Sequence, residues 1–414
     1  MFRSGAWVTR QRVRAYTLLV LGLALAALAV WVALSDGLVD RNGKPLGTDF
    51  SNVYAAGTLV RQGRPADAYD PERQHAAEIA VFDGRNVPFF GWHYPPFFLT
   101  AAALLAHLPY AAALLVWLLA TGLAYGATVR GIVAAVPLPR TEIWLATVAF
   151  PAVFVNVGHG QNGFLTAALL GSGLLMLDRR PAVAGLLIGL MAYKPQFGVL
   201  VPLALLAGRR WTTIAAAGAT VVALGLATTV LMGAEIWPAF LASTRFTQQV
   251  VLEEGALGWE KAQSIFAAAR LWGLAVPIAY GLQVGLALAL AATLVWLWRS
   301  TVDHDLKAAS LACACLLATP YVLDYDLVVL AVAIAFYVRH GVVHGFRDYE
   351  ISLLAGVWFM PLLARTVTTA SGLPLGLIAL LALYLMLLRR ARADLADVSR
   401  RGAPGRDDAA HEVT

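Results

Sequence analysis

Charged residues and cysteines are scarce in this chain of 414 residues. Only 14% of the residues are Asp, Glu, Lys or Arg, against roughly 25% in an average soluble domain, which excludes that class. The two cysteines, Cys313 and Cys315, lie in one apolar run and point to different sides of a helix, so no disulfide or thiolate metal site is expected. The chain also lacks a Walker loop, an H-E-x-x-H pair and a G-x-S-x-G elbow, so ATP hydrolysis, zinc proteolysis and serine hydrolysis lose support.

Hydrophobic residues, in contrast, make up 59% of the chain and gather in long runs. A run of roughly 17–25 apolar residues crosses a hydrocarbon core of about 30 Å as a helix. Because backbone polar groups must be satisfied within the bilayer, the sequence predicts an all-α polytopic membrane protein rather than a barrel. About 12 transmembrane segments are expected, some of them short or kinked. They are residues 16–34, 97–129, 141–157, 164–178, 182–193, 195–208, 211–233, 274–298, 307–319, 326–338, 350–366 and 372–388.

Basic residues collect in short clusters between these segments, and they indicate orientation rather than nucleic-acid binding. Arginines before residue 16 predict a cytoplasmic N-terminus and an uncleaved signal anchor at 16–34. If all the basic clusters face the cytoplasm, both termini lie inside. The chain is therefore expected to be a multi-pass protein of a cell membrane, and its Ala- and Arg-rich composition favours a bacterial inner membrane.

This orientation defines the predicted domain organisation. Residues 1–390 are expected to form one transmembrane domain, followed by a disordered cytoplasmic tail at 391–414. The outer face receives a long first loop at 35–96, a second long loop at 234–273, and three short corners. The corners read "GHGQNG" (158–163), "YKPQ" (193–196) and "TPYVLDYD" (319–326). Polar chemistry is therefore predicted on the outer side.

Asp49 lies in the first outer loop, just before a predicted helical stretch. One interpretation is structural, because Thr48 or Asp49 could accept the free amide hydrogens of the first turn and stabilise the helix by about 1 kcal/mol. The other is chemical: a carboxylate near the exit of the first segment could act as a general base on a lipid-linked substrate. Local sequence alone favours the cap.

Two further outer segments carry polar side chains that could contact a substrate. The segment "HYPPFF" closes the first loop, and its His93 and Tyr94 read either as an interfacial anchor or as site residues. The corner "GHGQNG" reads either as a tight turn or as a binding corner. In the second interpretation Gln161 and Asn162 hydrogen-bond sugar hydroxyls or phosphate oxygens, and His159 supplies a donor nearby.

Lys194 interrupts an otherwise apolar interval, and a lysine at that depth requires a partner or a water-filled cavity. It could bind a phosphate, or it could extend toward the outer interface. The triplet Asp324, Tyr325, Asp326 stands at the start of a later segment, where helix capping and a site role are equally good readings.

Four stretches follow one another along the chain from about residue 45 onward. They are "GTDFSNVYAAGTLVRQGRPADAYD", "HYPPFF", "VGHGQNG" and "DRRPAVAGLLIGLMAYKPQFGVLVPL". In this order and spacing they resemble glycosyltransferase family 87, which contains polyprenyl-phosphate-mannose-dependent α-1,2-mannosyltransferases of the membrane-embedded GT-C superfamily. The resemblance extends to about residue 335.

The resemblance implies a GT-C-type helical bundle with its active site under the first outer loop. It implies that Asp49 is the catalytic base, which deprotonates an acceptor hydroxyl in a single inverting displacement on the outer face. A hexose, with mannose as the first candidate, would move from a polyprenyl-phosphate donor to a glycolipid or glycan acceptor. Lys194 would stabilise the phosphate, Gln161, Asn162, His159 and Tyr94 would support the substrate, and no metal or cofactor is expected.

One departure separates this chain from many members of the family. They carry a histidine at the outer end of a late segment, where this chain reads "VLDYD". Tyr325 or Asp326 then replaces the hydrogen bonding of that histidine, or the acceptor differs. A transporter or flippase of a lipid-linked or anionic substrate is the alternative function, with Lys194 and the broken segments forming its binding site.

Overall fold

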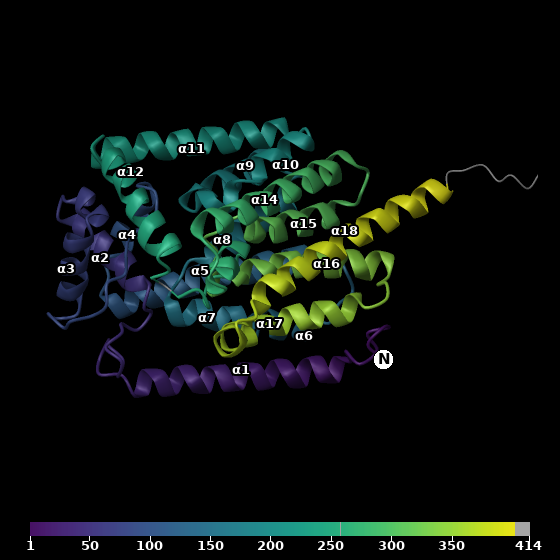
Figure 1. Cartoon of the computed structure of the whole chain (residues 1–414), viewed down its shortest axis with the longest axis horizontal. Coiled ribbons are helices and arrows are strands. Elements are labelled where there is room, and N and C mark those ends of the chain that lie inside the picture. The colour runs from purple at the N-terminus through teal and green to yellow at the C-terminus, as the bar shows by residue number, and fades with distance from the viewer. Residues whose placement is uncertain (257, 402–414) are drawn as a thin grey trace, which may run out of the picture.

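The computed structural model describes residues 1–256 and 258–401 and is helical throughout. In that part of the chain, β-structure is limited to isolated bridges. Figure 1 shows the long helices running roughly along one direction, with α1 (Arg10–Ala33) along one edge of the bundle and α11 (Trp211–Met232) along the opposite edge. The predicted all-α polytopic membrane fold is confirmed.

Six helical segments are long and apolar enough to cross a membrane. They are α1, α5 (Tyr110–Val133), α11, α14 (Val276–Arg299), η5 with α16 (Asp324–His344) and α17 (Glu350–Ser371). A seventh results if α6 (Arg140–Val148) and α7 (Pro151–His159), which meet at a bend of 44°, form one span. This number is lower than the expected 12 or so, because several predicted segments are helices too short to cross alone.

Prolines account for two of the interruptions. The predicted segment 97–129 divides at Pro109, which ends one helix and serves as the N-cap of α5, because its ring fixes the backbone and removes a donor. The helix before it is α4 (Phe98–Leu105). Pro195 follows Lys194 at a break between two short helical stretches, with Lys194 itself outside helical geometry at φ −125° and ψ 71°. These stretches are α9 (Pro181–Leu190) with η2 (Met191–Tyr193), and η3 (Pro195–Gly198) with α10 (Val201–Ala207).

The centre of the bundle is α15 (His304–Leu317), in which every residue from Ala308 to Leu317 is buried. It packs against α14, α16 (Leu330–His344) and α18 (Leu375–Arg401). Cys313 and Cys315 are both buried there and free. Helices α1 and α11 instead expose most of their apolar side chains, as helices that face lipid do.

The two long loops fold into short helices at one end of the bundle (Figure 1). The first loop contains α2 (Phe50–Arg61), η1 (Pro65–Tyr69) and α3 (Pro71–Val81). The second contains α12 (Ile236–Phe246), the π-helical turn η4 (Thr247–Glu253) and α13 (Ile265–Leu271). The corner "GHGQNG" joins α7 to α8 (Gly163–Met176).

Helix α18 corrects the predicted boundary of the tail. The chain stays helical to Arg401, so the predicted disorder from residue 391 is wrong for 391–401. The rest of the predicted tail, 402–414, lies outside the described residues.

Candidate functional site

Asp49 stands at the start of α2, and its side chain contacts the α7–α8 corner rather than its own helix. It makes no capping hydrogen bond to α2, so the capping interpretation fails. Its Oδ2 accepts a hydrogen bond from Gln161 Nε2 at 3.0 Å, and its Oδ1 lies 3.5 Å from His159 Nδ1. Its backbone amide donates to the carbonyl of His159 at 3.0 Å. The carboxylate is therefore held by a segment 110 or so residues away, as a reactive group would be.

Gly160 shapes the corner that holds Asp49. It ends α7 in the left-handed conformation at φ +62°, which glycine adopts without strain. A Cβ atom at this position would lie 2.6 Å from the Cβ of Phe50, so α2 could not approach as closely. The carbonyl of Gly160 accepts a hydrogen bond from Trp117 Nε1 at 3.1 Å. The glycine therefore lets His159 and Gln161, on either side of it, both reach Asp49.

Gln161 links Asp49 to Tyr94. Its Oε1 accepts hydrogen bonds from the Tyr94 hydroxyl at 3.1 Å and from the Asn162 backbone amide at 3.0 Å. These two donors fix the orientation of the side-chain amide, so that Nε2 can only donate, and it donates to Asp49. Burial raises the pKa of Tyr94, which keeps its hydroxyl a donor.

His159 borders Asp49 on its other side. Its Nδ1 lies 2.8 Å from Thr48 Oγ1, and the Thr48 hydroxyl is also 3.3 Å from Asp49 Oδ1. The imidazole meets the ring of Tyr325 edge-on, with ring centroids 5.7 Å apart. Tyr325 therefore connects the corner of Asp49 with the segment that precedes α16.

The electrostatic surroundings favour the ionised form of Asp49. Burial acts to raise its pKa, but the hydrogen bond and charge of His159, the hydrogen bond from Gln161 and the charge of Lys261 together lower that pKa below the ordinary value. The side chain retains 18% exposure. Asp49 is thus an accessible carboxylate that is ready to accept a proton at neutral pH.

Asn162 contributes an unsatisfied acceptor. Its Oδ1 is buried and has no hydrogen-bond partner among the described residues. Its backbone carbonyl is fully used, because it accepts from the amide and hydroxyl of Thr166 and from the Tyr193 hydroxyl. A buried carbonyl oxygen without a donor costs about 1–3 kcal/mol, so a substrate hydroxyl at this position would be favourable.

Lys194 and Asp326 form a buried ion pair beside this cluster. Lys194 Nζ donates to Asp326 Oδ1 at 2.6 Å, and the side chains are 3% and 2% exposed. Asp326 Oδ2 also accepts from the Leu323 amide at 3.0 Å. The ammonium lies 5.2 Å from the centre of the Tyr325 ring. The charge predicted to bind phosphate is thus already compensated by a carboxylate, and the contacts of Lys194 indicate a structural role.

Lys261, in the second long loop, is a cation that the sequence did not distinguish from its neighbours. The loop is fixed beside the 321–326 segment by a bridge between Ala262 and Leu323 and by the Gln263 amide, which donates to the Val322 carbonyl at 2.9 Å. Lys261 has no ion pair with any residue the structure describes, yet its charge reaches Asp49. Arg270 of the same loop is instead engaged by carbonyls at Glu253 and Leu274 and by Trp259.

Glu78 is a second site-proximal carboxyl that sequence reasoning missed. It is fully buried on α3, where Phe90 N donates to its Oε2 at 3.0 Å. Burial, with a smaller contribution from the charge of Asp49, raises the pKa of Glu78 to about 9. Two neighbouring acids are therefore in opposite protonation states at pH 7. No pattern in the local sequence distinguishes Glu78 from the other charged residues of α3.

His93, in the segment "HYPPFF", contacts the second loop rather than Asp49 directly. Its Nδ1 lies 2.8 Å from Thr247 Oγ1 in η4, and burial lowers its pKa to about 4. A neutral histidine thus joins the end of the first loop to the second.

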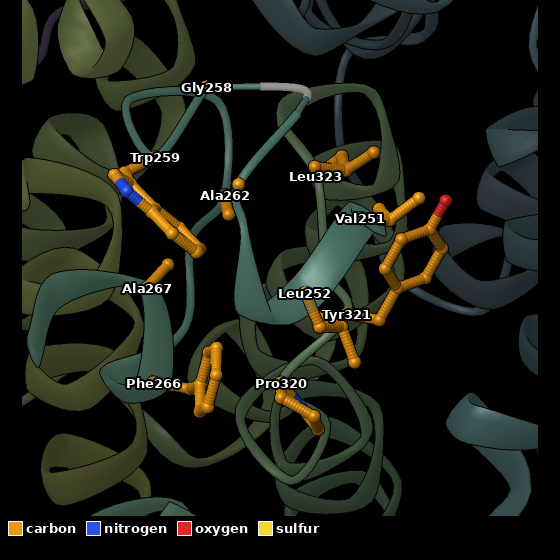
Figure 2. A pocket seen from close by; sticks show the side chains of 11 residues that line it. Val251, Leu252, Gly258, Trp259, Ala262, Phe266, Ala267, Pro320, Tyr321 and Leu323 are labelled. Atoms are coloured by element: carbon orange, nitrogen blue, oxygen red, sulfur yellow. The ribbon is translucent and has the colours of Figure 1, made fainter. Parts of the chain in front are cut away.

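An apolar pocket lies between the second long loop and the segment around Tyr321 (Figure 2). Trp259 and Phe266 lie on one side of it, and Leu252 and Tyr321 on the other. Leu323, which precedes Asp324, completes the lining. The side chains that line the pocket are almost all apolar, which suits a hydrocarbon rather than a sugar.

Comparison with known proteins identifies one family. The family model for glycosyltransferase family 87 matches residues 92–320, which is more than half of the chain. No curated protein and no solved structure matches the chain. The match includes Tyr94, Gln161, Lys194 and Lys261, whereas Asp49 lies well before its first residue and Asp326 shortly after its last. It favours the glycosyltransferase interpretation over the transporter or flippase.

Proposed function

Because the chain belongs to glycosyltransferase family 87 and is a membrane glycosyltransferase, we propose that it transfers a hexose from a polyprenyl-phosphate donor to a glycolipid or glycan acceptor. Mannose is the first candidate for the hexose. The observation that carries the proposal is the position of Asp49, an accessible carboxylate held by Gln161 and His159.

In the proposed reaction Asp49 acts as the general base. Its carboxylate takes the proton of an acceptor hydroxyl while the oxygen of that hydroxyl attacks the anomeric carbon. The bond between this carbon and the phosphate oxygen breaks, its electron pair leaves with the polyprenyl phosphate, and the configuration inverts. One base is sufficient, because the phosphate leaves as an anion and needs no proton, unlike the leaving alcohol in glycoside hydrolysis.

The leaving phosphate requires positive charge, and we assign this role to Lys261 rather than Lys194. The ammonium of Lys194 is 2.6 Å from Asp326 and buried, whereas Lys261 makes no ion pair among the described residues and lies beside the 321–326 segment. Its charge would be available to a phosphate oxygen. The apolar side chains of Trp259, Phe266 and Tyr321 would then contact the start of the isoprenoid chain of the donor.

The remaining predicted site residues have supporting roles in this proposal. Tyr94 and Gln161 hold Asp49 through consecutive hydrogen bonds, and Asn162 Oδ1 would accept a sugar hydroxyl. Tyr325 would form one wall of the sugar site, since its ring contacts His159. Lys194 and Asp326 would fix the segment that carries Tyr325.

The reaction is proposed to take place on the extracytoplasmic face. Both long loops gather at the end of the bundle that carries Asp49 (Figure 1). The other end of the bundle, where α16 ends, carries Arg339, Arg347 and Arg390. Basic residues at that end are expected for the cytoplasmic side.

The test is sugar transfer by the purified full-length protein in lipid vesicles. Radiolabelled polyprenyl-phosphate mannose, polyprenyl-phosphate glucose and a nucleotide sugar would be compared as donors, with glycolipid acceptors extracted from a bacterial envelope. Transfer from a polyprenyl-phosphate donor, with an anomeric configuration in the product opposite to that in the donor, is expected. Transfer from the nucleotide sugar alone, or retention of configuration, would contradict the proposal.

A further inference from the structure

A second cluster of ionisable side chains lies at the other end of α16, far from Asp49. Asp303 stands in the loop between α14 and α15, and His340 and His344 stand one turn apart in the last two turns of α16. The 14 residues of helix between Asp326 and His340 separate the two clusters by roughly 20 Å. The Asp303 cluster therefore has no direct part in sugar transfer.

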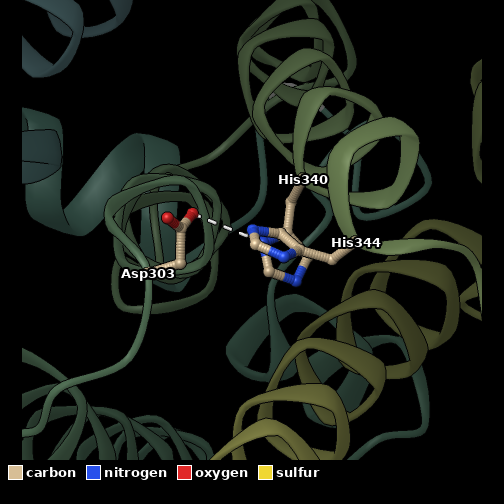
Figure 3. A group of neighbouring side chains, drawn as sticks. All are labelled: Asp303, His340 and His344. Carbon is tan, nitrogen blue, oxygen red and sulfur yellow. Dashed lines mark hydrogen bonds and ion pairs between the residues drawn. The ribbon is translucent and has the colours of Figure 1, made fainter.

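The three side chains converge on one point, as Figure 3 shows. One ligand atom from each of Asp303, His340 and His344 lies within 4.8 Å of the others. The i, i+4 spacing places both imidazoles on one face of α16, with ring centroids 4.5 Å apart. Asp303 Oδ1 is 3.3 Å from His340 Nδ1. Contraction by up to about 1.5 Å would bring these atoms to the separations of ligands around a Zn²⁺ ion.

A partner outside the cluster sets the tautomer of His340. His340 Nε2 lies 3.0 Å from Asp394 Oδ2 on α18, so Nε2 carries a proton and donates to that carboxylate. Asp394 is in turn held by Arg390 at 2.9 Å and by Arg347 at 3.0 Å. The lone pair of Nδ1 is thereby directed at Asp303. A carboxylate behind a histidine is the usual outer support of a zinc ligand.

The charge around the cluster also permits a cation. The pocket that contains it is lined by the carboxylates of Asp303, Asp394 and Asp397 and by Arg347 and Arg390. Arg390 is further neutralised by the buried Glu350 at 2.9 Å. Carboxylates thus outnumber arginines around the cluster, and the open side of the pocket leaves room for a water ligand.

We propose that Asp303, His340 and His344 bind one divalent transition-metal ion, with Zn²⁺ as the best match to two imidazoles and a carboxylate. A solvent molecule completes the tetrahedron. The ion ties the α14–α15 loop to the end of α16, and through Asp394 to α18. It stabilises the end of the bundle opposite the sugar site.

The competing interpretation is an ion pair without metal, in which His340 bridges Asp303 and Asp394. The two differ at His344, which a metal requires and the bridge does not. His344 is exposed, so His344→Ala can fold. Asp303→Asn keeps a side-chain oxygen for the cap of α15, where Asp303 now accepts from the Asp305 amide, but loses the anionic ligand. His107→Ala, at another exposed histidine, is the matched control.

The experiment treats the purified full-length protein with a chelator, desalts it and adds Zn²⁺ alone. Wild type and His107→Ala should each bind one ion per chain and melt at a higher temperature with Zn²⁺, and Co²⁺ should give the visible absorption of a tetrahedral site. His344→Ala and Asp303→Asn should each lose at least about tenfold in affinity, together with the thermal shift. The proposal fails if wild type binds no ion, or if His344→Ala binds as tightly as wild type.

Discussion

Asp49 and Asp326 are two carboxylates of one region with opposite surroundings. Asp49 is 18% exposed and contacts only neutral donors and an imidazole, whereas Asp326 is 2% exposed and is fixed by an ammonium at 2.6 Å and a backbone amide at 3.0 Å. A carboxylate that must accept a proton needs access and a spare lone pair. Asp49 has both, whereas the two oxygens of Asp326 accept hydrogen bonds from Lys194 and Leu323. This difference supports our proposal that Asp49 is the reactive group and Asp326 a structural one.

Breaking the Lys194–Asp326 pair should have the largest effect on stability. Lys194→Met leaves the charge of Asp326 buried without a partner, which should cost about 3–5 kcal/mol in the free energy of unfolding. Thermal unfolding in detergent measures the loss, and Lys44→Met is the control at a lysine without an ion pair in the described structure. The double variant Lys194→Met, Asp326→Leu should regain most of the stability. Equal melting of Lys194→Met and wild type would show that the pair is not structural.

Replacing Gln161 should change the pH dependence of sugar transfer, because Gln161 donates a hydrogen bond to Asp49. Gln161→Glu turns the donor at 3.0 Å into an anion, which raises the pKa of Asp49. A base is active only when ionised, so transfer is lost as pH falls through this pKa, and the acidic limb of the pH–rate profile should move to higher pH. Near neutral pH the rate should fall by about 10–100-fold. An unmoved acidic limb would exclude Asp49 as the titrating base.

Removing the charge of Lys261 should weaken donor use with little change in stability. Lys261→Gln should raise the KM for the polyprenyl-phosphate donor by about tenfold, the equivalent of about 1.4 kcal/mol. Arg245→Gln, at an exposed arginine of the same loop, is the control and should leave the KM unchanged. If the folded double variant Lys194→Met, Asp326→Leu raises the KM for the donor more than Lys261→Gln does, the phosphate would be bound by Lys194 instead.

Glu78 provides a prediction about how stability depends on pH. Its pKa in the folded protein is about 9, above that of an unfolded glutamate, so its contribution to stability is fully present below about pH 4.5 and declines as pH rises toward 9. Within that interval the decline approaches about 1.4 kcal/mol per pH unit. Glu78→Gln removes the titration and should flatten the pH dependence of Tm. If Tm depends on pH in the same way in Glu78→Gln and wild type, Glu78 would be ionised in the folded protein.

The sequence predicts those parts of the fold that depend on local composition, which are the helices and their breaks. Apolar runs predict helices because the bilayer leaves the backbone no other partner, and Pro109 and Pro195 mark real breaks. The number of spans could not be predicted, since α15 is apolar but is buried in protein rather than lipid. Hydropathy does not distinguish these two environments.

Some of the residues named as site candidates lie together in the structure, but the sequence did not show which of them contact one another. Asp49, His159 and Gln161 do converge, and resemblance rather than spacing brought them together. The contact between Lys194 and Asp326 joins residues 132 positions apart, and no local pattern reports such a distance. Arg270 donates to two backbone carbonyls, whereas Lys261 has no ion pair among the described residues, and this difference arises only in the folded chain.

The most direct test compares single-turnover transfer by Asp49→Asn with that by the double variant Lys194→Met, Asp326→Leu, both in lipid vesicles and matched for melting temperature. Asn keeps the shape of Asp49 and removes the base, so Asp49→Asn should lose about 10²–10⁴-fold in rate. The double variant should stay within about tenfold of wild type, because we propose that the carboxylate of Asp326, which it lacks, does not contact the substrate. Full activity in Asp49→Asn with none in the folded double variant would reverse the two assignments.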